Sequence, residues 1–137
     1  MEHKGSANAW SENGKEIIRG TYFEDLGDIT FKSTNPADAF SMIRQIITDQ
    51  FLEPAKIFCF GGDHSISYPV IDAFSEKYPN LNILHLDAHA DLYENFDNNP
   101  YSHASPFARL LEKGKIKSLT QVGIRTLNQH QREQAEK

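Results

Sequence analysis

Three candidate metal ligands stand at every second position of the sequence: Asp87, His89 and Asp91. They directly follow the short apolar run 81–86, whose length and composition predict a buried strand. If the extended geometry continues past this run, side-chain alternation puts all three on one face, with neighbours about 6 to 7 Å apart. Carboxylates and an imidazole in such a row can hold one divalent cation or two close ones. A solvated, polar strand end is the alternative for any single one of them.

A second group of such residues occupies positions 61–65 (Gly-Gly-Asp-His-Ser) and follows the apolar run 56–60, which also predicts a strand. Open parallel sheets bind ligands at the carboxyl ends of their strands, so His64 is expected to lie near Asp87. The two glycines permit a sharp turn before His64. Taken alone, Asp63 could merely cap the helix that follows. Together, the two groups predict a metal site at one edge of the sheet.

The elements that must position these residues alternate between helix and strand. Apolar spacing, caps and prolines predict helices over 36–51, 68–78, 107–113 and 128–136, and a short one near 15–19. Apolar runs predict strands over 56–60, 81–86 and 119–124, and a short one near 29–31. This order predicts an α/β fold, a three-layer α/β/α arrangement with a mostly parallel sheet, in a single domain over 1–137. The lone cysteine, Cys59, lies in an apolar run and is expected to be buried and inert.

Composition narrows the classes of function. The chain has 137 residues, of which 39% are hydrophobic and 24% are charged, as in one globular domain. A net charge of −5 without a basic run argues against a nucleic-acid partner and favours a small cationic substrate. Neither a membrane-spanning run of ~20 apolar residues nor an apolar leader is visible, so we expect no membrane partner and a cytoplasmic location.

The two motifs, 61–65 and 87–91 (Asp-Ala-His-Ala-Asp), together resemble the ureohydrolase family of arginases and agmatinases, and the resemblance extends from about 25 to 125. It implies an arginase-like fold, a homo-oligomer in the complete protein, and two manganese ions (Mn²⁺). By this resemblance His64, Asp87 and Asp91 would bind one ion, and Asp87 and His89 the other. Two such ions activate a water at neutral pH, here for attack on a guanidinium carbon with release of urea.

The resemblance also suggests roles for two loop residues. His103 matches the family's loop histidine that shuttles protons, and a loop imidazole with a pKa of about 6.5 suits that role. A solvated loop histidine is the alternative. Tyr93, two residues after Asp91, is closer to agmatinases than to arginases, which favours a decarboxylated guanidino substrate. We assign His85 to structure.

The sequence also departs from the family pattern, because neither the second pair of metal-binding aspartates, an Asp-x-Asp motif, nor the substrate-binding glutamate follows Arg125. The chain therefore resembles an internal part of a longer protein. The first hypothesis is a manganese hydrolase of agmatine, with arginine or guanidinobutyrate also possible, and with this chain inactive when alone. The alternatives are a formimidoylglutamate hydrolase, whose loop often lacks the histidine, and a non-catalytic metal-binding or assembly fragment.

Overall fold

The computed structural model describes residues 13–14, 24–52 and 56–136. The chain divides into two compact units, residues 1–30 and residues 31–137. The named helices and strands and the candidate site all lie in the second unit. The short helix predicted near 15–19 falls outside the described residues, and a single domain over 1–137 stays a prediction.

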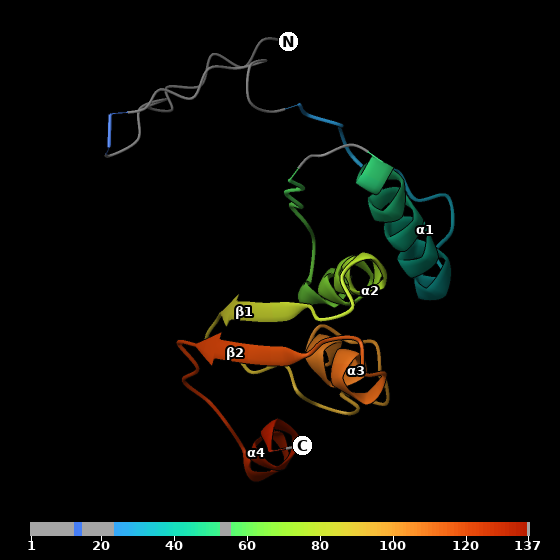
Figure 1. Cartoon of the computed structure of the whole chain (residues 1–137). Helices are drawn as coiled ribbons and strands as arrows, with labels where there is room; N and C mark the ends of the chain where they lie inside the picture. Colours follow the sequence, from blue (N-terminus) through green and yellow to red (C-terminus); the bar gives the residue numbers. More distant parts are fainter. Residues whose placement is uncertain (1–12, 15–23, 53–55, 137) are drawn as a thin grey trace. The chain divides into compact units, whose positions relative to one another are not determined.

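The helices begin where the local sequence predicts them. Helix α1 (Pro36–Asp49) starts at Asn35, whose side chain accepts a hydrogen bond from the Ala37 amide. The 3₁₀ turns η1 (Gln50–Leu52) and η2 (His64–Ile66) follow, and the second leads directly into α2 (Ser67–Lys77). The remaining elements are β1 (Asn82–Leu86), α3 (Pro106–Glu112), β2 (Ser118–Val122) and α4 (Gln129–Ala135) (Figure 1). Four predicted helices and two predicted strands are thus confirmed with small shifts at their ends.

None of the helices within the described ranges is long and apolar enough to cross a bilayer.

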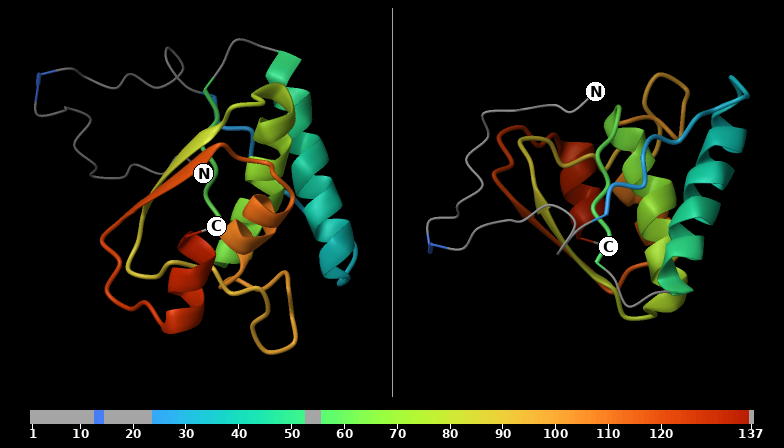
Figure 2. Two further views of the ribbon diagram at one scale, coloured as in Figure 1. Left: turned by 60° about the horizontal axis from the view of Figure 1, so that its bottom comes forward. Right: turned by 90° about the horizontal axis from the view of Figure 1, so that it is seen from above.

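Strands β1 and β2 pair in parallel, from Asn82 opposite Ser118 to Leu86 opposite Val122. Figure 2 shows α2 and α3 on one side of the two strands, with α1 beyond α2. The apolar side chains of the inner sheet face pack against a buried core of Tyr68, Ala90, Leu92, Phe107 and Leu110. An α/β fold with a parallel sheet is therefore confirmed, and its core lies directly beneath the strand ends that carry the candidate ligands.

The strand predicted over 56–60 is not formed. The described residues 56–60 have no regular structure, and Phe58 and Phe60 are 83% and 96% exposed. An apolar run becomes a strand only where a neighbour supplies backbone partners and a second layer covers its side chains. The prediction that Cys59 is buried is wrong for the same reason, because the thiol lies in this exposed segment. The strand predicted near 29–31 is also wrong, since these residues have no regular structure.

The outer face of the sheet is uncovered within the described residues. Leu84, Leu86 and Val122 alternate with the residues of the inner face and are 64%, 71% and 53% exposed. We call these three residues the outer apolar face. The third layer of the predicted three-layer arrangement would belong on this side.

Because exposed apolar sheet surfaces associate, we expect the 137-residue chain on its own to self-associate through the outer apolar face. Leu84→Lys should then shift the sedimenting species toward the 15.6 kDa monomer in analytical ultracentrifugation. Gln45→Lys adds the same charge on an exposed position of α1 and should leave the assembly unchanged. An equal change in sedimentation for both substitutions would show that the outer apolar face does not cause the association.

Candidate metal centre

The chain turns sharply after β1 instead of continuing as a strand. The Asp87 carboxylate accepts a hydrogen bond from the His89 amide at 2.8 Å, and Asp91 has a φ of 50°. The extended row of side chains considered from the sequence therefore does not form. The residues after β2 hold this bend, because the Asp87 amide donates to Val122 O and the Arg125 amide donates to Ala88 O.

Gly123 makes this arrangement of backbone possible. Its φ of 94° lies in the region that favours glycine. A Cβ at this position would lie 3.1 Å from the Asp87 carbonyl oxygen, closer than most such contacts. The glycine therefore allows β2 to approach the bend from which the candidate ligands project.

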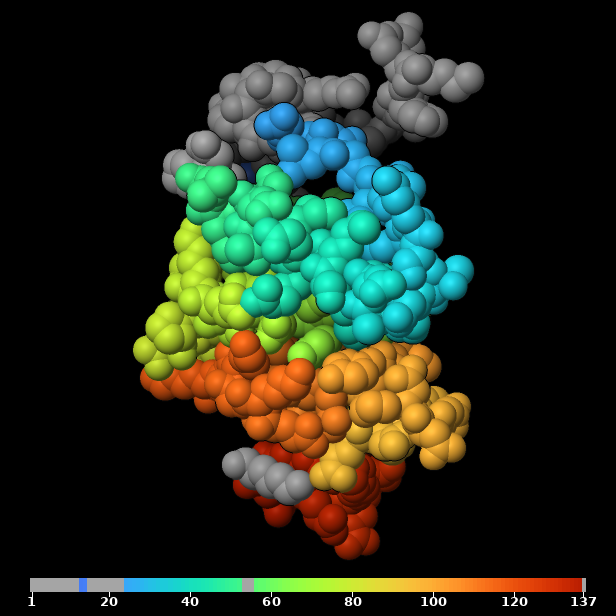
Figure 3. Space-filling view, turned by 90° about the vertical axis from the view of Figure 1, so that its right-hand side faces the viewer, coloured from blue at the N-terminus to red at the C-terminus, as the bar shows by residue number. Residues whose placement is uncertain are grey.

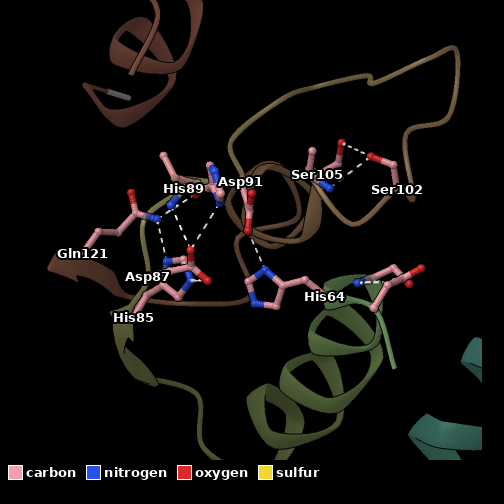
Figure 4. Close-up of polar contacts among 12 residues, drawn as sticks. His64, His85, Asp87, His89, Asp91, Ser102, Ser105 and Gln121 are labelled. Carbon is pink, nitrogen blue, oxygen red and sulfur yellow. Dashed lines mark hydrogen bonds and ion pairs between the residues drawn. The ribbon is translucent and has the colours of Figure 1, made fainter. Parts of the chain in front are cut away.

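Four donor side chains meet beside this bend: His64, His85, Asp87 and Asp91 (Figure 4). Each offers one ligand atom, and these atoms all lie within 4.8 Å of one another. His64 Nδ1 is 2.5 Å from Asp91 Oδ2, and His85 Nε2 is 3.6 Å from Asp87 Oδ2. Imidazole and carboxylate groups, as on His64, Asp87 and Asp91, suit divalent transition metals, including manganese. The residues present therefore fit such an ion.

Of the four predicted metal ligands, His64, Asp87 and Asp91 lie in this cluster and His89 lies outside it. The His89 side chain is 65% exposed, although its Nδ1 remains 3.5 Å from Asp87 Oδ1. His85, which we assigned to structure, takes the fourth place. Strand alternation carried a signal for it, since residues two apart share a face and His85 stands two before Asp87.

The aromatic ring of Phe107 supports both histidines of the cluster. This ring is 2% exposed, and its centroid lies 4.5 Å from that of His85 and 5.6 Å from that of His64. The two imidazoles stack on each other with centroids 5.2 Å apart. Helix α3 thus holds the orientation of both imidazole rings through one buried side chain.

The charges of the cluster are set by close partners. The hydrogen bond with Asp91 raises the pKa of His64, and burial lowers the pKa of His85. The amide of His89 donates to Asp87 and lowers the pKa of that carboxyl. The site therefore presents Asp87 in its anionic form, as a metal ligand requires.

His103 projects from the loop between Asp91 and α3 and is exposed. Its ring meets the edge of the Phe96 ring, with centroids 5.6 Å apart. Two residues earlier, Tyr101 packs against Phe40 of α1 and Tyr68 of α2, at 5.9 and 5.6 Å. Figure 3 shows the loop, in amber, beside the α1 segment, in teal. The loop that carries His103 is thus anchored on two helices.

Tyr93 lies at the other end of this loop and is held by α4. The side chain of Asn128, which caps α4, donates a hydrogen bond to the Tyr93 hydroxyl at 2.8 Å. The Tyr93 ring also contacts those of Phe96 and His130, with centroids 5.5 and 6.1 Å away. These contacts fix the orientation of the Tyr93 ring, which stands two residues after Asp91 in the sequence.

Asp63 joins the glycine turn to the helical segment that carries His64. Its carboxylate accepts the Ser65 amide at 2.8 Å, and hydrogen bonds from Ser65, with a smaller contribution from the charge of His103, lower its pKa. The ionised cap therefore stabilises the fold above the unfolded pKa of about 3.9, and this contribution is lost as the pH falls through the lower folded value.

We expect Asp63→Ala to reduce the free energy of unfolding by about 1 kcal/mol at pH 7, because the first helical turn loses its cap. Asp63→Asn should keep most of the stability, since its amide oxygen can still accept. Urea unfolding of the metal-free chain at pH 7 and at pH 3 measures the free energy of unfolding of both variants. A loss for Asp63→Ala that is as large at pH 3 as at pH 7 would argue against a charged cap.

The parallel α/β fold and the His/Asp cluster at the end of β1 define the class of protein, an α/β protein with a metal-type site at its sheet edge. Residues 3–137 match the family model described as "Arginase family". The chain belongs to the arginase family. The resemblance expected from the two motifs is thereby confirmed.

Individual relatives agree with this assignment. The chain is 42% identical to "Arginase 1, mitochondrial" of Arabidopsis thaliana over 97% of its own length and 41% of that protein. It is 38% identical to the agmatinase of Bacillus subtilis over 76% of its length and 36% of that protein. This chain spans about two fifths of the length of these curated relatives.

Solved structures confirm the arginase-like fold. The arginase from Medicago truncatula superposes with a TM-score of 0.87 and 38% identity, over 96% of this chain and 44% of that one. The formimidoylglutamase from Bacillus subtilis superposes with a TM-score of 0.83 and 29% identity, over 96% of this chain and 42% of that one.

Proposed function

We propose that the complete protein is a binuclear manganese hydrolase that cleaves a guanidino C–N bond and releases urea. Its ligands from this chain would be His64, Asp87, His89 and Asp91. The observation that carries the proposal is the convergence of three of them, from η2 and from the bend after β1, within 4.8 Å. When bound, the metal pair would supply the acidity that activates water at neutral pH.

Asp87 is proposed as the ligand that both ions share. Its two carboxylate oxygens face different imidazoles, with Oδ2 3.6 Å from His85 Nε2 and Oδ1 3.5 Å from His89 Nδ1. The carboxylate also lies in the cluster with His64 and Asp91, so it can contribute to both proposed ions. His89 is therefore within reach of an ion bound at Oδ1, although its ring stands outside the tight cluster.

His103 is proposed to carry a proton between solvent and the leaving amine. Its exposure on an anchored loop suits an imidazole that must exchange protons with water.

For the substrate we propose agmatine, a decarboxylated guanidino compound, because Tyr93 stands two residues after Asp91 and its hydroxyl is held by Asn128. The net charge of −5 supports a cationic substrate. Arginine is the second candidate, because the Arabidopsis arginase matches 97% of the chain and the Bacillus agmatinase 76%. We also propose that the complete protein is a cytoplasmic homo-oligomer.

The test uses a chimera in which residues 1–137 replace the matching segment of the Medicago truncatula arginase; we call it the completed protein. With manganese bound, it should release urea from agmatine faster than from arginine. Its Asp87→Ala variant is the matched control. Urea from arginine alone would move the assignment to the second candidate. A folded, manganese-loaded protein that releases urea from neither compound would contradict the proposal.

A further inference from the structure

His85 and Gln121 form a hydrogen-bonded pair behind Asp87 that the proposed function does not use. We propose that Gln121 holds the proton of His85 on Nε2, and that His85 thereby acts as a positioning residue for Asp87 and is not itself a metal ligand. The assignment of the tautomer rests on the geometry of the described residues alone. Only its consequence for metal binding rests on the proposed function.

The two residues face each other across the sheet. His85 on β1 is opposite Gln121 on β2 in the strand register, and the His85 side chain is 8% exposed. Gln121 Nε2 lies 2.9 Å from His85 Nδ1 and 2.7 Å from the carbonyl oxygen of Ala90. Figure 4 shows Gln121 and His85 beside Asp87.

The contact with Ala90 decides which way the Gln121 amide is turned. A backbone carbonyl oxygen can only accept a hydrogen bond, so the atom facing it must be the NH₂ group of Gln121. The opposite orientation would place two oxygens 2.7 Å apart. The amide therefore donates one N–H to Ala90 and has its second N–H available for His85.

The orientation of the amide fixes the tautomer of the imidazole. Because Gln121 offers an N–H to Nδ1, Nδ1 must accept with its lone pair. A neutral imidazole that accepts at Nδ1 carries its proton at Nε2. A proton at Nδ1 would instead face the amide N–H at 2.9 Å, donor against donor.

The nitrogen that carries this proton faces Asp87. His85 Nε2 is buried and has no hydrogen-bond partner among the described residues, and the Asp87 Oδ2 atom lies 3.6 Å away. The ring packs against both His64 and Phe107, and these contacts restrict its rotation away from Asp87. A modest rotation of the carboxylate completes an N–H···O bond and satisfies the buried nitrogen.

This pair has a defined effect on Asp87. A hydrogen bond from Nε2–H to one carboxylate oxygen orients the group, as partners behind metal ligands commonly do. A protonated Nε2 has no lone pair for a cation, which excludes His85 as a ligand through that atom. His85 thus supports Asp87 from the core side, while Gln121 supports His85.

The first test measures the tautomer in the metal-free 137-residue chain. Long-range ¹H–¹⁵N correlation, or magic-angle-spinning NMR if the chain associates, distinguishes a protonated from an unprotonated ring nitrogen. The His85 signals are assigned by their loss in His85→Gln. We expect Nε2–H, and we expect Gln121→Met, which removes the N–H that faces Nδ1, to increase the population of the Nδ1–H tautomer. A proton on Nδ1 in the unsubstituted chain would overturn the proposal.

The second test measures the manganese dissociation constant of the completed protein. His85→Leu should weaken binding by roughly 10- to 100-fold, whereas His85→Gln, whose amide N–H can reach Asp87, should restore most of it. Gln121→Met should also weaken manganese binding. It replaces His85→Leu as the test variant if His85→Leu does not fold. Unchanged affinity in folded His85→Leu or Gln121→Met would refute the positioning role. A completed protein that binds no manganese would refute the proposed function and leave the NMR result standing.

Discussion

Asp87→Ala in the completed protein is expected to reduce bound manganese from two ions per chain to one or none and to abolish urea release. Asp87 lies in the cluster with His64 and Asp91, and its Oδ1 atom is 3.5 Å from His89 Nδ1, so one substitution removes a ligand from both proposed ions. It also removes negative charge that offsets the repulsion between two dications. The loss of affinity should exceed the 10- to 100-fold typical of residues behind the ligands.

Inductively coupled plasma mass spectrometry after gel filtration counts the metal in this experiment. The matched control is Asp49→Ala, which removes an exposed carboxylate at the end of α1. The control should retain both ions. Two ions retained by folded Asp87→Ala would show that the carboxylate is not shared.

His103→Asn in the completed protein is expected to lower turnover by roughly 10²- to 10⁴-fold, the usual contribution of a general acid or base. Asparagine keeps a polar side chain on the loop but carries no proton near neutral pH. Because the His103 ring contacts Phe96 and lies outside the four-residue cluster, both manganese ions should stay bound.

The pH–rate profile and chemical rescue decide the role of His103. The limb of the profile that reports its titration should disappear in His103→Asn, and added imidazole should restore part of the activity of His103→Ala. An unchanged profile would exclude His103 from proton transfer. Loss of metal would instead identify it as a residue of the binding site.

Helix ends were predictable because their signals are local. The Asn35 cap with Pro36 behind it, and the capping box of Asn128 with Gln131, involve hydrogen bonds over two or three residues. Such contacts depend on neighbours in the chain, and no distant partner is needed for them. The motifs 61–65 and 87–91 likewise indicated the family before any geometry was known.

The errors arose where distant residues decide the structure. The run 56–60 has strand composition, but a strand needs a paired neighbour and a covering layer, and composition shows neither. The place of His89 depends on the bend at Asp87, which the Asp87 carboxylate and the close approach of Gly123 produce. Side-chain alternation describes an extended chain, so it could not place the residues after that bend.

We propose that this sheet edge would bind two manganese ions, with Asp87 contributing to both. Electron paramagnetic resonance of the manganese-loaded completed protein tests it most directly, because two Mn²⁺ ions that share a ligand give an exchange-coupled signal. We expect this signal at two ions per chain, and we expect the signal of isolated ions to replace it in Asp87→Ala. A signal of isolated ions alone, at every ratio of manganese to unsubstituted protein, would contradict it.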